Sequence, residues 1–129
     1  MNARLRYAAC ATLLLAAFPC AASDSTAGPG IKHVVMCWLK EPGNAAHRER
    51  VIATSRELLI IPEVQDMVVG GPVASDRPNV EDGFDVGIVM TFRDESALNV
   101  YLEHPEHMQR ARETLAPLCA RVQIVDIRY

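Results

Sequence analysis

The fold is decided by the stretch from Ile31 to Leu39, which reads IKHVVMCWL. Its β-branched and bulky residues, followed by the turn sequence Lys40–Gly43, predict a β-strand. Side chains alternate between the two faces of a strand. The odd set is His33, Val35, Cys37 and Leu39, and the even set is Val34, Met36 and Trp38. Both sets are apolar except for His33, so we expect a central strand that is covered on both faces.

Further elements follow from this strand outward along the chain. Asn44 is a helix N-cap residue, and helical spacing of apolar residues continues to about Ile60, before Pro62. A second helix begins at Arg93–Ser96 and is interrupted at His104, ahead of Pro105. The remaining expected elements are strands at 64–69, 84–92 and 122–127 and a polar loop at 74–83.

This order of elements predicts an α+β fold of the ferredoxin-like type, βαββαβ with a four-stranded antiparallel sheet. Both helices then lie on one face of the sheet, which leaves the other face bare. Because the strands are apolar on both sides, an exposed sheet face would be unusual for a monomer. We therefore predict a homodimer in which two sheets meet face to face as an α/β barrel.

The N-terminal segment does not belong to this domain. Residues 1–22 carry Arg4 and Arg6, a short apolar run and small residues before Ser23, a pattern typical of a secretory signal peptide. The apolar run is too short for a membrane span, so stable membrane insertion is not expected after cleavage. Lipid attachment at Cys20 is the alternative. The predicted organisation is a signal at 1–22, a disordered tether at 23–30 and one domain at 31–129, exported to the periplasm or the medium.

Composition excludes several classes of function. The formal net charge of −3 lacks the basic character that nucleic-acid binding requires. The sequence has no Cys-x-x-Cys spacing, and Glu103 and Glu106 lie on different helical azimuths from the histidines, so we predict no metal site and no cofactor.

The candidate site residues are His33 and the group Tyr101, His104 and His107. Spacings of three place the latter group near one helical face, although the break at Pro105 makes the spacing approximate. A neutral histidine can accept a proton near pH 7 while a tyrosine donates to a developing oxyanion. The structural alternative is that His104 caps a helix, His107 bonds a backbone carbonyl and Tyr101 packs in the core.

Cys37 and Cys119 remain after signal cleavage, and an oxidising compartment permits a bridge between them. The predicted sheet brings the region before Val122 near the end of the first strand, which favours pairing. Against this, Cys37 shares the parity of His33, which we assign to the open face, and Cys119 follows a helix on the other face. We expect two buried thiols.

Taken together, these motifs resemble the stress-responsive dimeric α/β-barrel (Dabb) proteins. The resemblance is carried by IKHVVM from Ile31, Ile61–Val64, Val69–Gly70, Gly83–Asp85, Phe92, the pattern Tyr101-x-x-His104-Pro105-x-His107, and Val125–Asp126. It implies a ferredoxin-like fold that dimerises through its sheets.

A plant member of that family cyclises a linear polyketide. The resemblance to it implies that His107 is a general base, that Tyr101 polarises the substrate, and that His33 and His104 line or flank the pocket. Val86 and Thr54 stand where that member has a histidine and a tyrosine.

Two functions are consistent with these observations. The first is an exported protein that binds a small molecule in the pocket of a dimeric barrel, with ligand-binding roles for His33, Tyr101 and His107. The second is a cofactor-free enzyme, similar to a polyketide cyclase, a lyase or a monooxygenase, in which His107 removes a proton and Tyr101 stabilises the enolate.

Overall fold

The structure is a computed structural model, and it describes residues 29–129. The predicted signal peptide at 1–22 and most of the predicted tether lie outside the described residues. The elements are β1 (Ile31–Leu39), α1 (Ala45–Glu57), η1 (Leu58–Ile60), β2 (Asp66–Gly70), β3 (Val86–Phe92), α2 (Glu95–Glu103), α3 (Pro105–Arg110), η2 (Ala111–Leu115), α4 (Ala116–Leu118) and β4 (Cys119–Arg128). None of the helices within the described part of the chain has the length and apolar character needed to cross a membrane.

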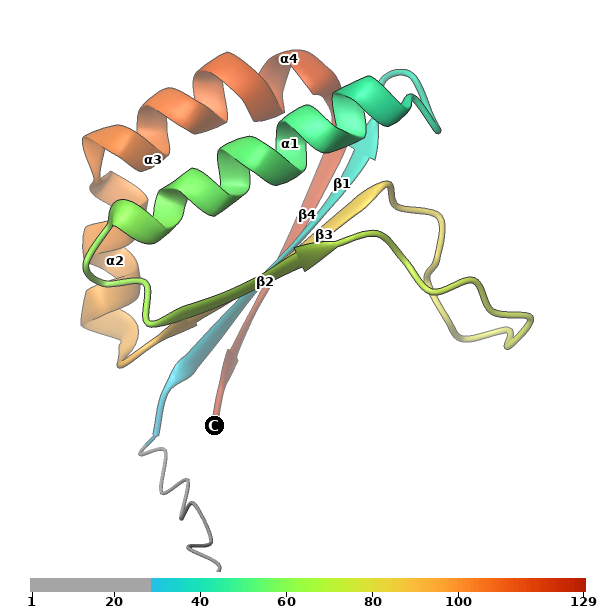
Figure 1. Ribbon diagram of the computed structural model, residues 1–129. Helices are drawn as coiled ribbons and strands as arrows, with labels where there is room; N and C mark the ends of the chain where they lie inside the picture. Colours follow the sequence, from blue (N-terminus) through green and yellow to red (C-terminus); the bar gives the residue numbers. More distant parts are fainter. Residues whose placement is uncertain (1–28) are drawn as a thin grey trace, which may run out of the picture.

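The four strands form one sheet in the order β2-β3-β1-β4, with every neighbouring pair antiparallel. All the helices lie over one face of this sheet, and the long connection between β2 and β3 extends away from the body of the molecule (Figure 1). The predicted ferredoxin-like fold is therefore confirmed. The predicted strands at 64–69, 84–92 and 122–127 are each displaced at their ends, by up to three residues, relative to β2, β3 and β4.

The helices begin where the sequence supplies a cap. The Asn44 side chain accepts a hydrogen bond from the His47 backbone N–H, and the Asp94 side chain accepts one from the Ala97 N–H. At the predicted break, His104 has an extended backbone that ends α2 and caps α3, with Pro105 at the first position of α3. Pro is tolerated there because that position has no helical hydrogen-bond partner to lose.

The paired strands include Gly30, one residue before the expected domain boundary. Gly30, which we assigned to the tether, is buried, and its backbone exchanges two hydrogen bonds with Tyr129 at the end of the chain. The pairing of β1 with β4 thus continues to Gly30.

The odd-numbered side chains of β1 face the helices and form the core. Ile31, Val35, Cys37 and Leu39 are buried with His33, whereas the even positions of β1 are half-exposed. Our assignment of the His33 and Cys37 face to the open side of the sheet was wrong. Because both sets are mostly apolar, their composition alone did not distinguish the helix-covered face from the bare one.

The bare face of the sheet is apolar at its centre. Cross-strand pairing places Val34 of β1 beside Val89 of β3 and Val125 of β4, and Val89 beside Val68 of β2. Val68 is 66% exposed and Val125 is 41% exposed. A continuous apolar surface of this kind marks an interaction site.

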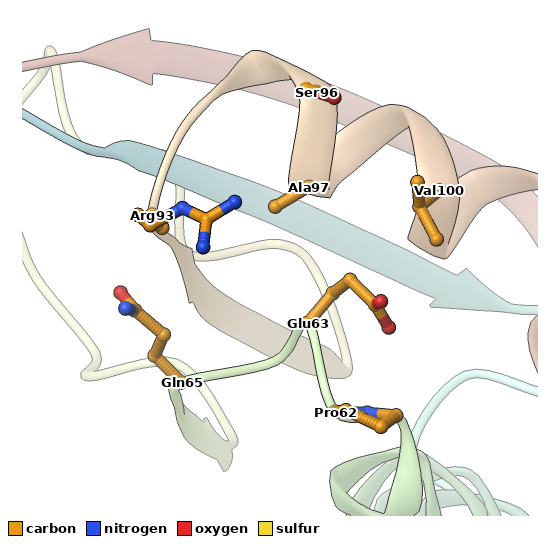
Figure 2. A pocket seen from close by; sticks show the side chains of 7 residues that line it. All are labelled: Pro62, Glu63, Gln65, Arg93, Ser96, Ala97 and Val100. Atoms are coloured by element: carbon orange, nitrogen blue, oxygen red, sulfur yellow. The ribbon is translucent and has the colours of Figure 1, made fainter.

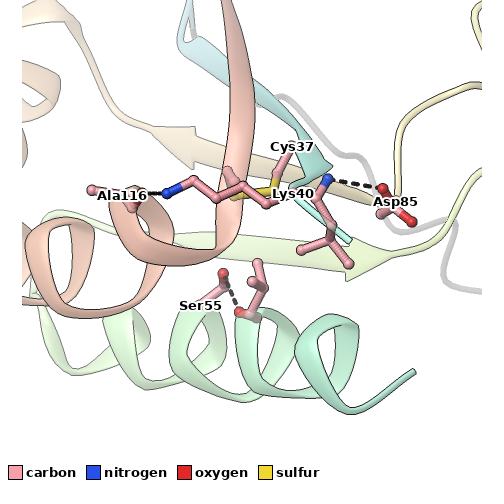
Figure 3. Close-up of a disulfide and its surroundings, with 8 residues drawn as sticks. Cys37, Lys40, Ser55, Asp85 and Ala116 are labelled. Atoms are coloured by element: carbon pink, nitrogen blue, oxygen red, sulfur yellow. Dashed lines mark hydrogen bonds between the residues drawn. A yellow bond between two sulfur atoms is a disulfide. The ribbon is translucent and has the colours of Figure 1, made fainter. Parts of the chain in front are cut away.

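The two cysteines are joined by a disulfide, with Cα atoms 5.7 Å apart (Figure 3). This corrects the expectation of two free thiols. Cys37 points toward the helices, not toward the open side, and Cys119 is the first residue of β4 itself. A register shift after Trp38 sets Cys119 opposite Leu39 and brings both sulfur atoms to the same side of the sheet.

Candidate functional site

A cavity of about 80 Å³, here called the inner cavity, lies between the sheet and the helices. Its floor comes from β1, β3 and β4, and its roof comes from α1, α2, α3 and η2. The apolar lining includes Val35, Ile88, Met90, Leu58, Leu115 and Ile124. Three polar rings also line it, those of His33, Tyr101 and His107. The structure thus brings together three of the four predicted site residues.

Tyr101 lies at the centre of this group. Its ring centroid is 4.5 Å from that of His107 and 6.0 Å from that of His33. The ring is 1% exposed, and burial raises the pKa of its phenol above the usual value. No residue among 29–129 hydrogen-bonds its hydroxyl in this structure, which leaves the hydroxyl as a neutral donor for an oxygen atom placed in the cavity.

His107 is held by its own helical segment. Its Nδ1 atom lies 3.0 Å from the carbonyl oxygen of Leu102. A carbonyl oxygen can only accept a hydrogen bond, so Nδ1 carries the hydrogen and Nε2 keeps the lone pair of the neutral ring. Burial lowers the pKa of His107 below its ordinary value, with a smaller opposing effect from the Leu102 hydrogen bond. His107 is therefore a neutral proton acceptor at pH 7.

His33 is fixed by a residue that sequence analysis did not assign to the site. Its Nδ1 atom lies 2.6 Å from Oδ1 of Asp126, its cross-strand partner on β4. A histidine Nδ1 hydrogen bond to a carboxylate sets the orientation of the ring and its tautomer. The antiparallel pairing of the first and last strands, which the fold predicts, is the signal that could have identified Asp126.

The fourth predicted residue, His104, does not line the inner cavity. His104 is half-buried, and Nδ1 accepts a hydrogen bond from the Glu106 backbone N–H, 3.2 Å away. The structural alternative thus describes His104 fully. The structural alternative also accounts for the Leu102 contact of His107 and for the buried position of Tyr101. However, Nε2 of His107 and the hydroxyl of Tyr101 have no hydrogen-bond partner among residues 29–129.

The two positions where the sequence differs from the plant cyclase also lie outside the inner cavity. Val86 is fully buried in the core at the start of β3, and Thr54 faces Thr114 across α1 and η2, with hydroxyl oxygens 3.5 Å apart.

A larger pocket of about 320 Å³ lies between α2 and the segment before β2 (Figure 2). It contains Glu63 and Arg93, but Arg93 is 75% exposed and donates from Nε to the neighbouring Asp94. The inner cavity is the better candidate, because two titratable groups whose pKa values are shifted by desolvation, Tyr101 and His107, converge there. Within residues 29–129, no group of three His, Cys, Asp or Glu side chains is placed to hold a metal ion.

Comparisons with known proteins agree with this architecture. A family model described as Stress Responsive A/B Barrel Domain matches residues 31–129. No curated protein matches the chain.

Several solved structures share the fold. A Dabb family protein from Mesorhizobium loti with a ferredoxin-like fold is 22% identical with a TM-score of 0.64, over 78% of this chain and 96% of that one. A dimeric ferredoxin-like protein of unknown function from Thermobifida fusca is 23% identical with a TM-score of 0.63, over 79% and 92%. The hydroxynitrile lyase from Passiflora edulis is 20% identical with a TM-score of 0.67, over 78% and 93%.

Proposed function

Since the chain belongs to the stress responsive A/B barrel domain family, we propose that it is an exported homodimer that binds a small molecule in the inner cavity of each subunit. This proposal rests on the contact between His107 Nδ1 and the Leu102 carbonyl, which leaves Nε2 as an acceptor on a ring whose centroid is 4.5 Å from that of Tyr101, and the Tyr101 hydroxyl is a donor. An acceptor and a donor in an otherwise mostly apolar cavity suit a ligand with one polar group on a short apolar body.

Export is supported by the signal-like residues 1–22 and by the Cys37–Cys119 disulfide, since disulfides persist in oxidising compartments. Dimerisation is supported by the apolar open face of the sheet. Similar proteins from Thermobifida fusca, Bacteroides fragilis and Jannaschia are described as dimeric.

The experiment that tests ligand binding starts with native mass spectrometry of the protein purified from the exported fraction. A retained small molecule would identify the ligand, whose affinity is then measured for Tyr101→Phe and His107→Ala. Each substitution removes one hydrogen bond, so we expect a loss of about tenfold in affinity for each. His47→Ala is the matched control, because His47 lies on α1 away from the cavity lining. Unchanged affinity in both site variants would refute the assigned roles.

A second candidate function is cofactor-free acid–base catalysis, favoured by the neutral state of His107. Nε2 of His107 would take a proton from an O–H or an activated C–H bond of the substrate, and the Tyr101 hydroxyl would stabilise the resulting negative oxygen. The fold that this chain shares with the Passiflora edulis hydroxynitrile lyase is compatible with such chemistry. Turnover that disappears in His107→Ala while ligand binding persists would favour catalysis over binding alone.

A further inference from the structure

Arg110 lines both the inner cavity and a second space. This outer groove, about 460 Å³ in volume, runs between α1 and the α3–η2 segment and is lined by polar side chains that include Arg50, Thr54 and Gln109. Within residues 29–129, Arg110 is the only residue that lines both spaces. Its side chain is therefore part of the boundary between them.

Two carboxylates hold Arg110 in this position. Its Nε donates to Glu57 Oε2 over 3.1 Å, and its Nη1 donates to the Glu106 carboxylate. Glu57 ends α1 and Glu106 lies in the first turn of α3, so the guanidinium bridges two helices. The planar guanidinium binds carboxylates in a fixed geometry, and the side chain is only 21% exposed. The Arg110 side chain is therefore fixed at the edge of the inner cavity by carboxylates from two different helices.

The same contacts determine which charged groups of the inner cavity can bind a ligand. The positive charge of Arg110 is matched by Glu57 and Glu106, and His107 is neutral. The Arg110 guanidinium thus already pairs with two carboxylates, and a neutral His107 has no charge with which to bind a carboxylate or a phosphate. The polar groups left for a ligand are the Tyr101 hydroxyl, Nε2 of His107 and Nε2 of His33, which suit a neutral molecule.

The cavity volume limits the length of that molecule. An apolar cavity of about 150 Å³ holds benzene, so the inner cavity, at about 80 Å³, has room for a smaller molecule only. We propose that Arg110 determines ligand length in this protein and restricts the inner cavity to short, neutral molecules with one hydrogen-bond acceptor, such as small ketones. The inference rests on the proposed function, because it takes the inner cavity to be the ligand site.

The test uses a series of linear methyl ketones, from butan-2-one to decan-2-one, as probes. Affinity is measured by NMR from the ring signals of Tyr101 and His107 in the dimeric protein. In the wild type, we expect affinity to stop rising once the chain reaches Arg110. In Arg110→Ala, affinity should instead rise about threefold with each methylene that occupies the volume vacated by the Arg110 side chain, and level off where the chain reaches the polar outer groove.

Three variants make the comparison specific. Arg50→Ala is the matched control, because Arg50 lines the outer groove but not the inner cavity, and it should behave like the wild type. Arg110→Met keeps most of the side-chain volume and should also stay flat beyond the short ketones. The double variant Glu57→Gln/Glu106→Gln keeps Arg110 but removes its anchors, and it should gain part of the affinity for long ketones. If the Arg110→Ala protein does not fold, the double variant serves as the test of the proposal in its place.

The outcomes separate the two proposals. Flat affinity in the wild type with rising affinity in Arg110→Ala supports the role of Arg110. If affinity rises equally with chain length in the wild type and in Arg110→Ala, the role of Arg110 is refuted and ligand binding in the inner cavity stands. If no ketone shifts either ring signal in any of the proteins, the proposed function fails, and this inference fails with it.

Discussion

His33 and Asp126 are paired across β1 and β4, with 2.6 Å between Nδ1 of the imidazole and Oδ1 of the carboxylate. The two partners lie in different surroundings, since the His33 side chain is 3% exposed and the Asp126 side chain is 47% exposed. The pair thus connects the wall of the inner cavity to the surface of the protein.

This pairing predicts that Asp126→Ala destabilises the fold, because a buried ring N–H loses its acceptor. We expect a decrease of about 1 kcal/mol in the free energy of unfolding, since the carboxylate is half in water and solvent competes for the bond. Asp126→Asn keeps an acceptor and should lose less. Urea unfolding measures both, with Asp66→Ala, an exposed position on β2, as the control. A loss no larger than that of the control would contradict the structural role.

The pKa of His107 predicts a loss of stability in acid. Burial, the main cause, lowers this pKa below the ordinary value of 6.5, so the unfolded chain binds a proton more readily than the folded protein. The stability that neutral His107 contributes is therefore present above pH 6.5 and is lost as the pH falls through the lowered pKa.

Unfolding by urea at about pH 7.5 and at about pH 5 measures this effect, with an NMR titration of the His107 ring to give its pKa directly. The control is His107→Gln, which cannot titrate and should lose less stability between the two pH values. An NMR pKa above 6.5 would reverse the expected sign.

The disulfide predicts a large stability difference between the bridged and unbridged proteins. It closes a loop with a sequence separation of 82 residues. Replacing both cysteines in Cys37→Ala/Cys119→Ala should therefore lower the free energy of unfolding by about 2–5 kcal/mol, mostly through the greater freedom of the unfolded chain.

Thermal unfolding of the double variant and of the wild type gives the difference. The mass of the unreduced, unfolded wild type should be lower by two hydrogen atoms than that of the reduced chain. Equal masses before and after reduction would show that the bridge is absent in the protein as produced.

The apolar face of the sheet predicts a dimer that a charge at its centre disrupts. In native mass spectrometry at micromolar concentration, we expect a dimer for the wild type and a monomer for Val125→Asp, because the charge would be buried without a partner. Val100→Asp, on the exposed side of α2, is the matched control and should remain dimeric. A monomeric wild type would contradict the predicted barrel.

Much of the fold could be predicted because local signals decide it. The bounds of β1 follow from its apolar run and the turn at Lys40–Gly43, and the capping roles of Asn44 and Asp94 follow from their chemistry. The start of β4 could not be predicted, because Cys119–Arg121 extend the strand by pairing with the end of β1, a contact that only the tertiary structure supplies.

The candidate site was predicted only where its residues belong to a motif. Tyr101 and His107 lie in one segment, and His33 stands out as polar in an apolar strand. Asp126 was noted only within the short Val125–Asp126 match and Arg110 in no motif, and neither residue type stands out locally, because many surface residues are aspartate or arginine. Their roles depend on partners far away in the chain, His33 for Asp126 and Glu57 for Arg110.

Because η2 is a π-helix, the side chains that this segment presents to the inner cavity depend on the number of residues in it. His107, Ala111 and Leu115 all line the inner cavity at intervals of four residues, which in an α-helix would drift by about 40° at each step. In η2 the Ala116 N–H bonds to the Ala111 carbonyl, five residues back, and the wider winding absorbs part of this drift. A homologue lacking one residue between 111 and 115 could keep a continuous helix and yet present a different side chain to its ligand. Among relatives, pocket specificity can therefore change by insertion or deletion while His107 and Tyr101 stay the same.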